Sequence, residues 1–217
     1  MFYMDINDSR TICFSFKNGK ISIIENFTKK RARLIINPPA LVRFVFYPNL
    51  SKKHLHCVVQ NSLQEHFPVD LKEYTTDYRV LSTGATMLVA VKTSSIEEYI
   101  RRAGINVLGV DLHQNFAGKY IANWDRQNIM LGTSRGHDIV LQFMENGQPT
   151  AITNCDYTNL ERIFSPYISI EGKAVIERAY LPKTADPVLP QYLHKIGVQA
   201  IMFEEVYDLQ QPKYAGV

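Results

Sequence analysis

An Asn-Gly pair between two β-rich runs occurs twice in this chain, and each copy predicts a tight β-hairpin. Residues 11–24 read TICFSFKNGKISII, and residues 139–152 read IVLQFMENGQPTAI. Asn-Gly favours the two positive φ angles that a two-residue hairpin turn requires. A further strand-like run precedes each hairpin, FYMDI at 2–6 and NIMLGT at 128–133. The recurrence predicts two copies of a three-stranded opening, and hence an internally duplicated α/β architecture.

Residues 41–112, which lie between the two copies, read as a compact β-α-β-β-α-β unit. Its first helix begins after Ser51, with apolar residues at helical spacing: Leu55, Val58, Val59 and Leu63. Its second helix starts near Ser94 and Ser95, each with a glutamate three residues later in capping-box spacing, and stops at Gly104. The strands are expected at 40–47, 77–81, 86–92 and 105–112.

The chain after residue 112 has helical patterns of its own. A short helix is expected around 113–124, and further helices at 157–164 and 171–179. The last unit, AYLPKTADPVLPQYLHKIGVQAIMF at 179–203, reads as a strand, a loop, a helix that stops at Gly197 and a second strand.

Composition and charge exclude several classes of protein. The 217 residues carry a formal net charge of +3, and 46% are hydrophobic, as in ordinary globular proteins. The basic cluster KKRAR at 29–33 is short and is interpreted as a solvated turn, so no nucleic-acid partner is expected. No apolar run approaches the roughly 20 residues of a membrane span. The first residues, MFYMDINDSR, lack the apolar core of a secretion signal.

The cysteines and histidines predict neither disulfides nor a metal centre. Cys13, Cys57 and Cys155 are odd in number and widely spaced, which is typical of a reduced cytosolic chain. The histidines are scattered and show no ligand spacing, so no metal is expected. Cys57 is interpreted as a core or half-buried residue rather than a reactive thiol. Trp124, at the end of a helix, is expected to pack between lobes.

Four stretches, taken in order, resemble the PilM/GspL group of actin-like proteins, which serve type IV pilus and type II secretion assembly and include BfpC and MshI. The stretches are QEHFPVDLKEYTTDYRVL (64–81), TMLVAVKTSSIEEYIRRAGINVLGVDL (86–112), LGTSRGHDIVLQFMENGQP (131–149) and AYLPKTADPVLPQYLHKIGVQA (179–200). Together they cover most of the chain. The resemblance implies an α/β fold, actin-like and ribonuclease-H-like, with two lobes.

The resemblance also implies domain boundaries. Residues 1–40 and 113–125 are expected to form lobe 1, and residues 41–112 the inserted β-α-β-β-α-β subdomain of the family. Lobe 2 is expected at 126–209, followed by a polar tail at 210–217. Few residues separate the second hairpin from the last unit, so the nucleotide-covering subdomain of a full PilM-like second lobe is expected to be missing. This reduced layout resembles the cytoplasmic domain of GspL.

In actin-like ATPases two hairpins hold the nucleotide phosphates, and each opens with an Asp two residues before a Gly. The Asp organises the metal and its water, while the Gly lets backbone N–H groups approach the phosphate. The first hairpin here retains Asp5 but has Asn7 at the glycine position. Asp8 adds negative charge where a phosphate would lie. Asp5 and Asp8 also admit a reading as a catalytic carboxylate pair, although turn capping is the preferred interpretation.

The second hairpin includes IMLGTSRGHD at 129–138, which we interpret as a degenerate phosphate-cradling turn. Gly132, Thr133 and Ser134 keep the form of such a turn. Met130 stands at the position of the metal-organising Asp, and a thioether cannot bind a hydrated metal ion. Arg135 and the nearby histidine are read as surface turn residues rather than anion binders.

The last motif, the adenosine loop, has PKTAD at 182–186 in place of glycines. All three nucleotide motifs are thus altered. These departures from the family's motifs predict no ATPase activity, no catalytic residues and no cofactor, and they leave residual nucleotide binding open.

The implied function is a non-catalytic scaffold on the cytoplasmic side of the bacterial inner membrane, peripheral to it or tethered there, with no membrane span in this chain. Its expected partners are a PilN-like bitopic membrane protein and the hexameric assembly ATPase, with a homodimer as a further option. The alternatives are a nucleotide-binding ATPase of the PilM type and a filament-forming protein. The sequence leaves open which machine is served, a pilus or a secretion system, and which surface binds partners.

Overall fold

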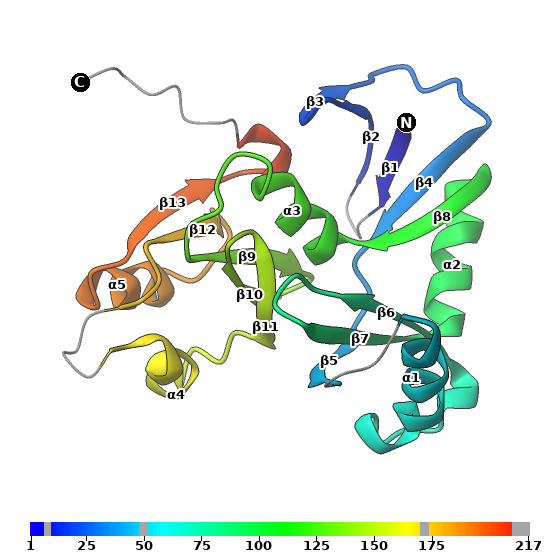
Figure 1. The fold of residues 1–217 in the computed structure, drawn as a ribbon. Coiled ribbons are helices and arrows are strands. Elements are labelled where there is room, and N and C mark those ends of the chain that lie inside the picture. The colour runs from blue at the N-terminus through cyan, green and yellow to red at the C-terminus, as the bar shows by residue number, and fades with distance from the viewer. Residues whose placement is uncertain (7–9, 48–51, 170–173, 210–217) are drawn as a thin grey trace. The chain divides into compact units, whose positions relative to one another are not determined.

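The computed structural model describes residues 1–6, 10–47, 52–169 and 174–209. They form two compact units (Figure 1). The first unit consists of Met1–Ser15 and Ile23–Leu112, and the second of Phe16–Ser22 and the chain from His113 onward.

The first hairpin opens a five-stranded sheet, whose strands are β1 (Phe2–Ile6), β2 (Thr11–Lys17), β3 (Lys20–Ile23), β4 (Arg31–Ile36) and β8 (Asn106–Leu112). The order is β3-β2-β1-β4-β8. β1 is antiparallel to β2 and parallel to β4, and β4 is parallel to β8. Asn18 and Gly19 have φ values of 53° and 74°, so the predicted tight turn is confirmed.

Strand β4 shows that the interpretation of residues 29–33 as a solvated turn is wrong for residues 31–33, whereas Lys29 and Lys30 precede the strand and are exposed. Arg31–Ile36 lie between β1 and β8, and the second half of the strand is fully buried: Leu34, Ile35 and Ile36. Arg33 stays near the surface, where its Nε donates to Asp111 Oδ2 on β8 at 3.0 Å. Burial of the apolar half of the strand, rather than its basic start, decides its place in the sheet.

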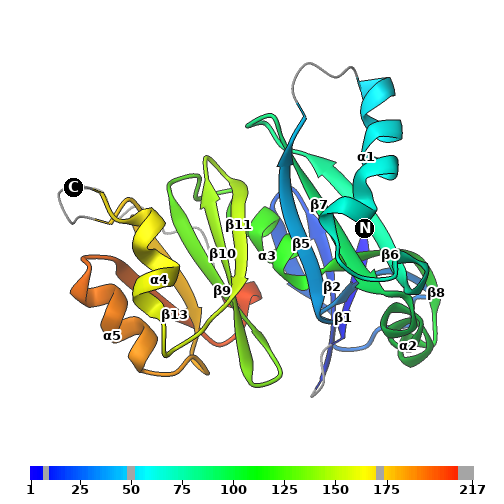
Figure 2. The same cartoon turned by 90° about the horizontal axis from the view of Figure 1, so that it is seen from below.

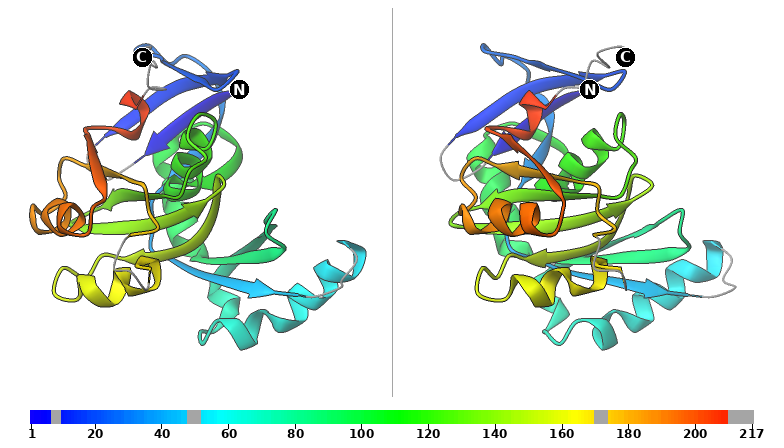
Figure 3. Two further views of the ribbon diagram at one scale, coloured as in Figure 1. Left: turned by 60° about the vertical axis from the view of Figure 1, so that its left-hand side comes forward. Right: turned by 90° about the vertical axis from the view of Figure 1, so that its left-hand side faces the viewer.

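A three-stranded antiparallel sheet contains β5 (Ala40–Phe46), β6 (Tyr74–Val80) and β7 (Ala85–Lys92), in the order β5-β7-β6. Helix α1 (Lys52–His66) packs on it (Figure 3), and a short 3₁₀ turn, η1 (Leu71–Glu73), precedes β6. The buried apolar residues of α1 are those expected from helical spacing: Leu55, Val59 and Leu63. Cys57 is exposed, so its interpretation as a core or half-buried residue is wrong.

Helix α2 (Thr93–Ala103) ends at Gly104, whose φ of 61° confirms the predicted stop. Its N-cap is Lys92 without a side-chain hydrogen bond, so the predicted capping box does not form. β8 follows α2 in the chain, and the two elements lie side by side in Figure 1. Because β8 pairs with β4, it completes the five-stranded sheet, whereas β5, β6 and β7 form the separate three-stranded sheet on which α1 packs. The boundary of the inserted subdomain at residue 112 stays a prediction.

The second unit repeats the topology of the first sheet. Helix α3 (His113–Ile121) leads into it, and residues 113–125 belong to this unit by their contacts. The expected assignment of these residues to lobe 1 stays a prediction. The strands are β9 (Ile129–Arg135), β10 (Asp138–Glu145), β11 (Gln148–Asn154), β12 (Arg178–Pro182) and β13 (Gln199–Phe203). Their order, β11-β10-β9-β12-β13, matches that of the first sheet, with the same antiparallel hairpins and parallel additions. The predicted duplication is thus confirmed.

Two helices, α4 (Leu160–Phe164) and α5 (Val188–Lys195), cover one face of this sheet, and α3 covers the other (Figure 2). Short 3₁₀ turns are η2 (Ser165–Tyr167) and η3 (Val206–Asp208). The predicted hairpin turn is confirmed by φ values of 52° at Asn146 and 73° at Gly147. The helix expected at 171–179 does not form in the described residues 174–179. Ala174 forms a β-bridge with Ile168, and β12 begins at Arg178.

Candidate functional site

The first half of the expected nucleotide site contains one described residue, Asp5. It is the penultimate residue of β1, 1% exposed, with Ile12 of β2 and Ile35 of β4 as its cross-strand neighbours. Asn7 and Asp8 lie outside the described residues.

The second half differs from the predicted phosphate-cradling turn. Gly132, Thr133 and Ser134 belong to strand β9, and the turn itself is formed by Gly136 and His137. Gly136 has a φ of 59°, and a glycine at this first turn position is typical of a type II′ hairpin. The interpretation of Gly-Thr-Ser as the turn is therefore wrong, because the ladder with β10 continues to Arg135.

Gly132 is required by close contacts inside the second unit. A Cβ atom there would lie 2.9 Å from Leu181 Cδ2, 3.3 Å from Ile139 Cγ2 and 3.4 Å from the Pro182 ring. These contacts are tighter than the ordinary separation of about 3.5–4.0 Å between carbon atoms. The missing side chain of Gly132 thus makes room for side chains of the neighbouring strands β10 and β12.

Met130 points into the apolar core of the same unit. It is fully buried in a cluster with Ile139, Leu181 and Leu189. A carboxylate at this position would lose its hydration without gaining a polar partner, at a cost of several kcal/mol. The Asp that the family places here does not fit this core.

The 182–186 loop and the β9–β10 hairpin meet at one edge of the second sheet, at the carboxyl ends of β9 and β12. Ser134 Oγ lies 2.8 Å from Thr184 Oγ1, within hydrogen-bonding distance. The Ala185 N–H donates to the Pro182 carbonyl at 2.9 Å, and Ala185 is buried in the core. The Thr184 hydroxyl and the Ala185 N–H of this loop therefore have hydrogen-bond partners within the protein.

Several polar groups at this edge bond within the protein. At the start of α5, Asp186 Oδ1 accepts from the Val188 N–H at 2.9 Å. Arg135 donates to Asn154 Oδ1 at 2.8 Å and lies 3.9 Å from the Asp138 carboxylate. Burial, with the charges of Asp156 and Asp186, raises the pKa of Cys155 to about 11.

The second unit contains a buried polar cluster that the sequence does not predict. Asp125 Oδ2 accepts from Tyr180 Oη at 2.6 Å and from Arg178 at 3.1 Å, and its Oδ1 accepts from the Gln127 N–H at 3.1 Å. Burial and the Asp125 hydrogen bond raise the pKa of Tyr180. Trp124 packs edge-on against Tyr180, with ring centroids 5.6 Å apart. The cluster joins the end of α3 to β12, and no local pattern could reveal partners more than fifty residues apart.

Metal-binding side chains do not gather in the described part of the chain. No group of three or more His, Cys, Asp or Glu side chains there could hold a metal ion. No helix among the same residues is long and apolar enough to cross a membrane.

Solved structures resemble this chain, although no protein-family model and no curated protein matches it. A chain of the PilM–PilN type IV pilus biogenesis complex superposes with a TM-score of 0.69 at 12% identity, over 95% of this chain and 88% of that one. A Bacteroides thetaiotaomicron protein with an actin-like ATPase fold and unknown function gives 0.59 at 9% identity, over 93% and 90%. The chain has the actin-like fold.

The cytoplasmic domain of EpsL, an inner-membrane component of the type II secretion system of Vibrio cholerae, is also similar. Its TM-score is 0.54 at 9% identity, over 82% of this chain and 80% of that one. The fold expected from the resemblance to PilM and GspL is therefore confirmed. Identities this low establish the fold and leave the function to be argued from the residues.

Proposed function

We propose that this protein is a non-catalytic scaffold of a type IV pilus or type II secretion assembly platform, on the cytoplasmic side of the bacterial inner membrane. The observation that carries the proposal is the extent of the likeness to the PilM–PilN chain, which spans 95% of this chain. An actin-like fold alone fits many functions. The second unit favours a non-catalytic function. Its candidate nucleotide edge, where the 182–186 loop meets the β9–β10 hairpin, is occupied by the protein's own side chains.

Three features of that edge support a role without catalysis. Magnesium-assisted phosphoryl transfer needs a metal-holding carboxylate and backbone groups that approach the phosphates. Met130 is buried among apolar side chains, and the space at Gly132 is filled by Leu181. Asp186 Oδ1 accepts from a backbone N–H at the start of α5. We infer that MgATP neither binds tightly nor is hydrolysed.

The inserted three-stranded sheet offers a docking edge for an extended peptide. β5 pairs with β7 on one side only, in the part of the chain that the structure describes. Its sequence, ALVRFVF, carries a single charge, and Phe46 is 66% exposed. Edge strands of this kind accept an added strand, which gains backbone hydrogen bonds and side-chain contacts. We propose that it receives a cytoplasmic segment of a PilN-like bitopic membrane protein, while the hexameric assembly ATPase is the second partner.

Affinity capture from membranes of the source cell tests the proposal. Wild-type protein is expected to retain a small bitopic membrane protein or a hexameric assembly ATPase, identified by mass spectrometry. Phe46→Lys should lose the bitopic protein, since a charge blocks strand addition at an edge. Val80→Lys is the matched control, because Val80 is 48% exposed on β6, at the opposite edge of the same sheet. Capture of neither partner would overturn the scaffold role.

Calorimetry with MgATP tests the same proposal against the ATPase alternative. We expect no binding in the micromolar range and no phosphate release. Sedimentation with and without MgATP is expected to be identical, because a polymer that requires nucleotide belongs to the filament-forming alternative. Micromolar affinity, hydrolysis or nucleotide-dependent polymers would contradict the non-catalytic scaffold.

A further inference from the structure

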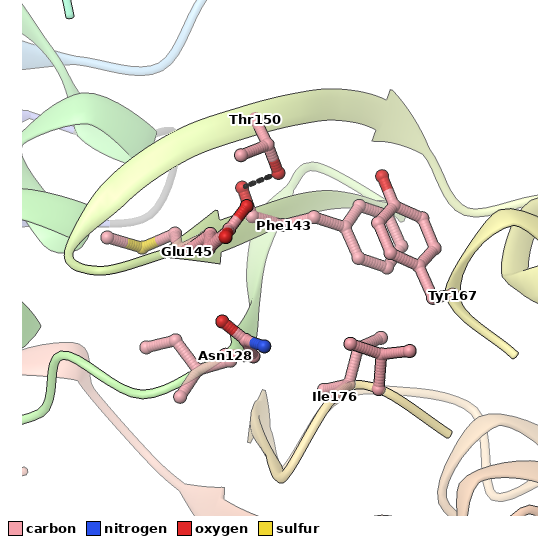
Figure 4. A pocket seen from close by; sticks show the side chains of 9 residues that line it. Asn128, Phe143, Glu145, Thr150, Tyr167 and Ile176 are labelled. Atoms are coloured by element: carbon pink, nitrogen blue, oxygen red, sulfur yellow. Dashed lines mark hydrogen bonds between the residues drawn. The ribbon is translucent and has the colours of Figure 1, made fainter. Parts of the chain in front are cut away.

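The second unit contains an apolar pocket of about 130 Å³ at the start of β9 and the end of β10. Figure 4 shows it from close by, with Asn128, Phe143, Glu145, Thr150, Tyr167 and Ile176 labelled among its lining residues. Most of the lining is carbon, from buried residues such as Phe143 and Ile176. This volume is close to that of an engineered cavity of about 150 Å³ that binds benzene, so the pocket admits one branched aliphatic group.

A β-bulge and an aromatic stack give the pocket its shape. The pairing of β10 with β11 shifts register after Phe143, and Thr150 becomes the extra residue on β11. Thr150 Oγ1 donates to the Phe143 carbonyl at 3.3 Å, close to this break in the ladder. The rings of Phe143 and Tyr167 stack at 3.9 Å between centroids, with an angle of 5°. The sheet therefore fixes Phe143 and Thr150, and the Tyr167 ring of η2 packs on Phe143 to form the adjoining wall.

The lining of the pocket carries a negative charge at Glu145, which no residue of the described ranges neutralises. Glu145 lines the pocket and is exposed, and Glu177 follows Ile176, with its N–H bonded to the Asn128 carbonyl at 2.7 Å. Across the described ranges, no hydrogen bond or ion pair engages the carboxylates of Glu145 and Glu177 or the side-chain amide of Asn128.

Two described arginines of this unit, Arg126 and Arg178, are engaged elsewhere. Arg126 lies against Gly147 and donates to the Ala122 carbonyl at 3.3 Å. Arg178 is paired with Asp125 at 3.1 Å. Within the described ranges, Glu145 therefore has no basic partner and can pair with a cation of a bound molecule.

We propose that the pocket binds an aliphatic side chain of a partner protein, with an adjacent lysine or arginine paired to Glu145. The volume is too small for a nucleotide or another ligand of drug size, which needs about 300 Å³ or more. An apolar anchor in a preformed pocket, ringed by polar groups, is the usual form of a protein-binding hot spot. The amide of Asn128 adds a donor and an acceptor for the backbone of the bound segment.

Strand β11 extends this site beyond a single side chain. β11 pairs only with β10 in the described residues, so its outer edge has backbone groups for an added strand. Thr150 belongs both to that strand and to the pocket lining. The hairpin turn after Arg135 lies at the other end of β9, about 20 Å away at about 3.3 Å per residue. The pocket is thus separate from the candidate nucleotide edge, and its occupancy does not depend on which machine the protein serves.

Methyl NMR on the full chain with three small probes tests the chemistry. 3-Methylbutylamine carries an aliphatic group and a cation, 3-methylbutan-1-ol is neutral, and 3-methylbutanoate is anionic. The amine should shift the methyl signals of Ile129, Val175 and Ile176, and should bind about 2- to 5-fold more tightly than the alcohol, the usual gain from an exposed ion pair. Glu145→Gln should remove this advantage, while Glu161→Gln, at an exposed glutamate on α4, should keep it.

A displayed hexapeptide library tests the partner class. Wild-type protein should enrich peptides with an aliphatic residue next to lysine or arginine. Val175→Phe should abolish the enrichment by filling the pocket mouth, where Val175 is 49% exposed. Val188→Phe should not, because Val188 is similarly exposed, at 47%, on α5. Equal binding of the three probes, or the same peptides enriched on Val175→Phe, would overturn the proposal. Those outcomes leave the scaffold role untouched, since that role is tested by capture at β5.

Discussion

Replacing Gly132 with alanine tests whether this glycine serves close packing or phosphate approach. The new methyl group would lie 2.9 Å from Leu181 Cδ2 and 3.3 Å from Ile139 Cγ2. Leu181 is fully buried and Ile139 nearly so, so neither can move into solvent. Overpacking costs about 1–3 kcal/mol, and the lower backbone entropy of alanine in the unfolded chain offsets about 0.5–1 kcal/mol. We expect the free energy of unfolding of the second unit to fall by about 1–2 kcal/mol.

Trp124 fluorescence during urea unfolding is a suitable assay. It is the single tryptophan of the chain and packs against Tyr180 in the second unit. With a urea dependence of about 2 kcal/mol per molar, the midpoint should fall by about 0.5–1 M. Gly109→Ala is the control, because its methyl group would meet the movable guanidinium of Arg33 at 2.8 Å, in the first unit. That variant should leave the Trp124 transition unchanged.

A double-mutant cycle with Leu181→Ala separates packing from other effects. Leu181→Ala removes the atom nearest to the new methyl group, so the two substitutions together should cost less than their sum by about 1 kcal/mol. The reasoning would be refuted by a Gly132→Ala protein of unchanged stability that has lost an affinity for MgATP measured in the wild type. That result would assign the glycine to phosphate approach.

Three further predictions concern the second unit. Asp125→Ala should lower the free energy of unfolding by about 2–4 kcal/mol, because it leaves the buried Tyr180 hydroxyl without its hydrogen-bond acceptor. Tyr180→Phe should lower it by about 1 kcal/mol, and urea unfolding measures both changes. Cys155 should react with iodoacetamide more slowly than the exposed Cys57 at pH 9, since a pKa of about 11 leaves about 1% thiolate there; mass spectrometry of the peptides gives the order. Tyr120→Phe removes a 2.6 Å hydrogen bond to the Leu209 carbonyl and should speed amide exchange at 204–209 by about 5-fold or more, for about 1 kcal/mol lost.

Elements whose geometry is set by neighbouring residues were predictable from the sequence. Both Asn-Gly turns form with positive φ, and α2 ends at Gly104 in the left-handed conformation. The strand, loop, helix and strand of residues 179–203 also form in the expected order. In each case a residue favours a backbone angle that few others tolerate.

The errors arose where partners are distant in sequence. β4 begins with basic residues that read as a turn, and its place depends on parallel pairing with β8, more than seventy residues later. The same pairing places β8 in the five-stranded sheet rather than in the sheet of β5, β6 and β7. The capping box failed because α2 begins directly from β7, with Lys92 at the N-cap and both serines inside the helix.

Some features of the candidate site were likewise predictable from the sequence, and others depended on residues distant in the chain. The sequence alone determined the duplicated three-stranded openings and the apolar residue at position 130, because these are properties of short segments. Only the tertiary structure decided what Met130 and Gly132 contact, since Leu181 approaches them from β12, about fifty positions away. The same holds for Asp125 and its partners on β12. A turn is fixed by the few dihedral angles of its own residues, whereas the role of a buried side chain is fixed by the atoms that folding places against it.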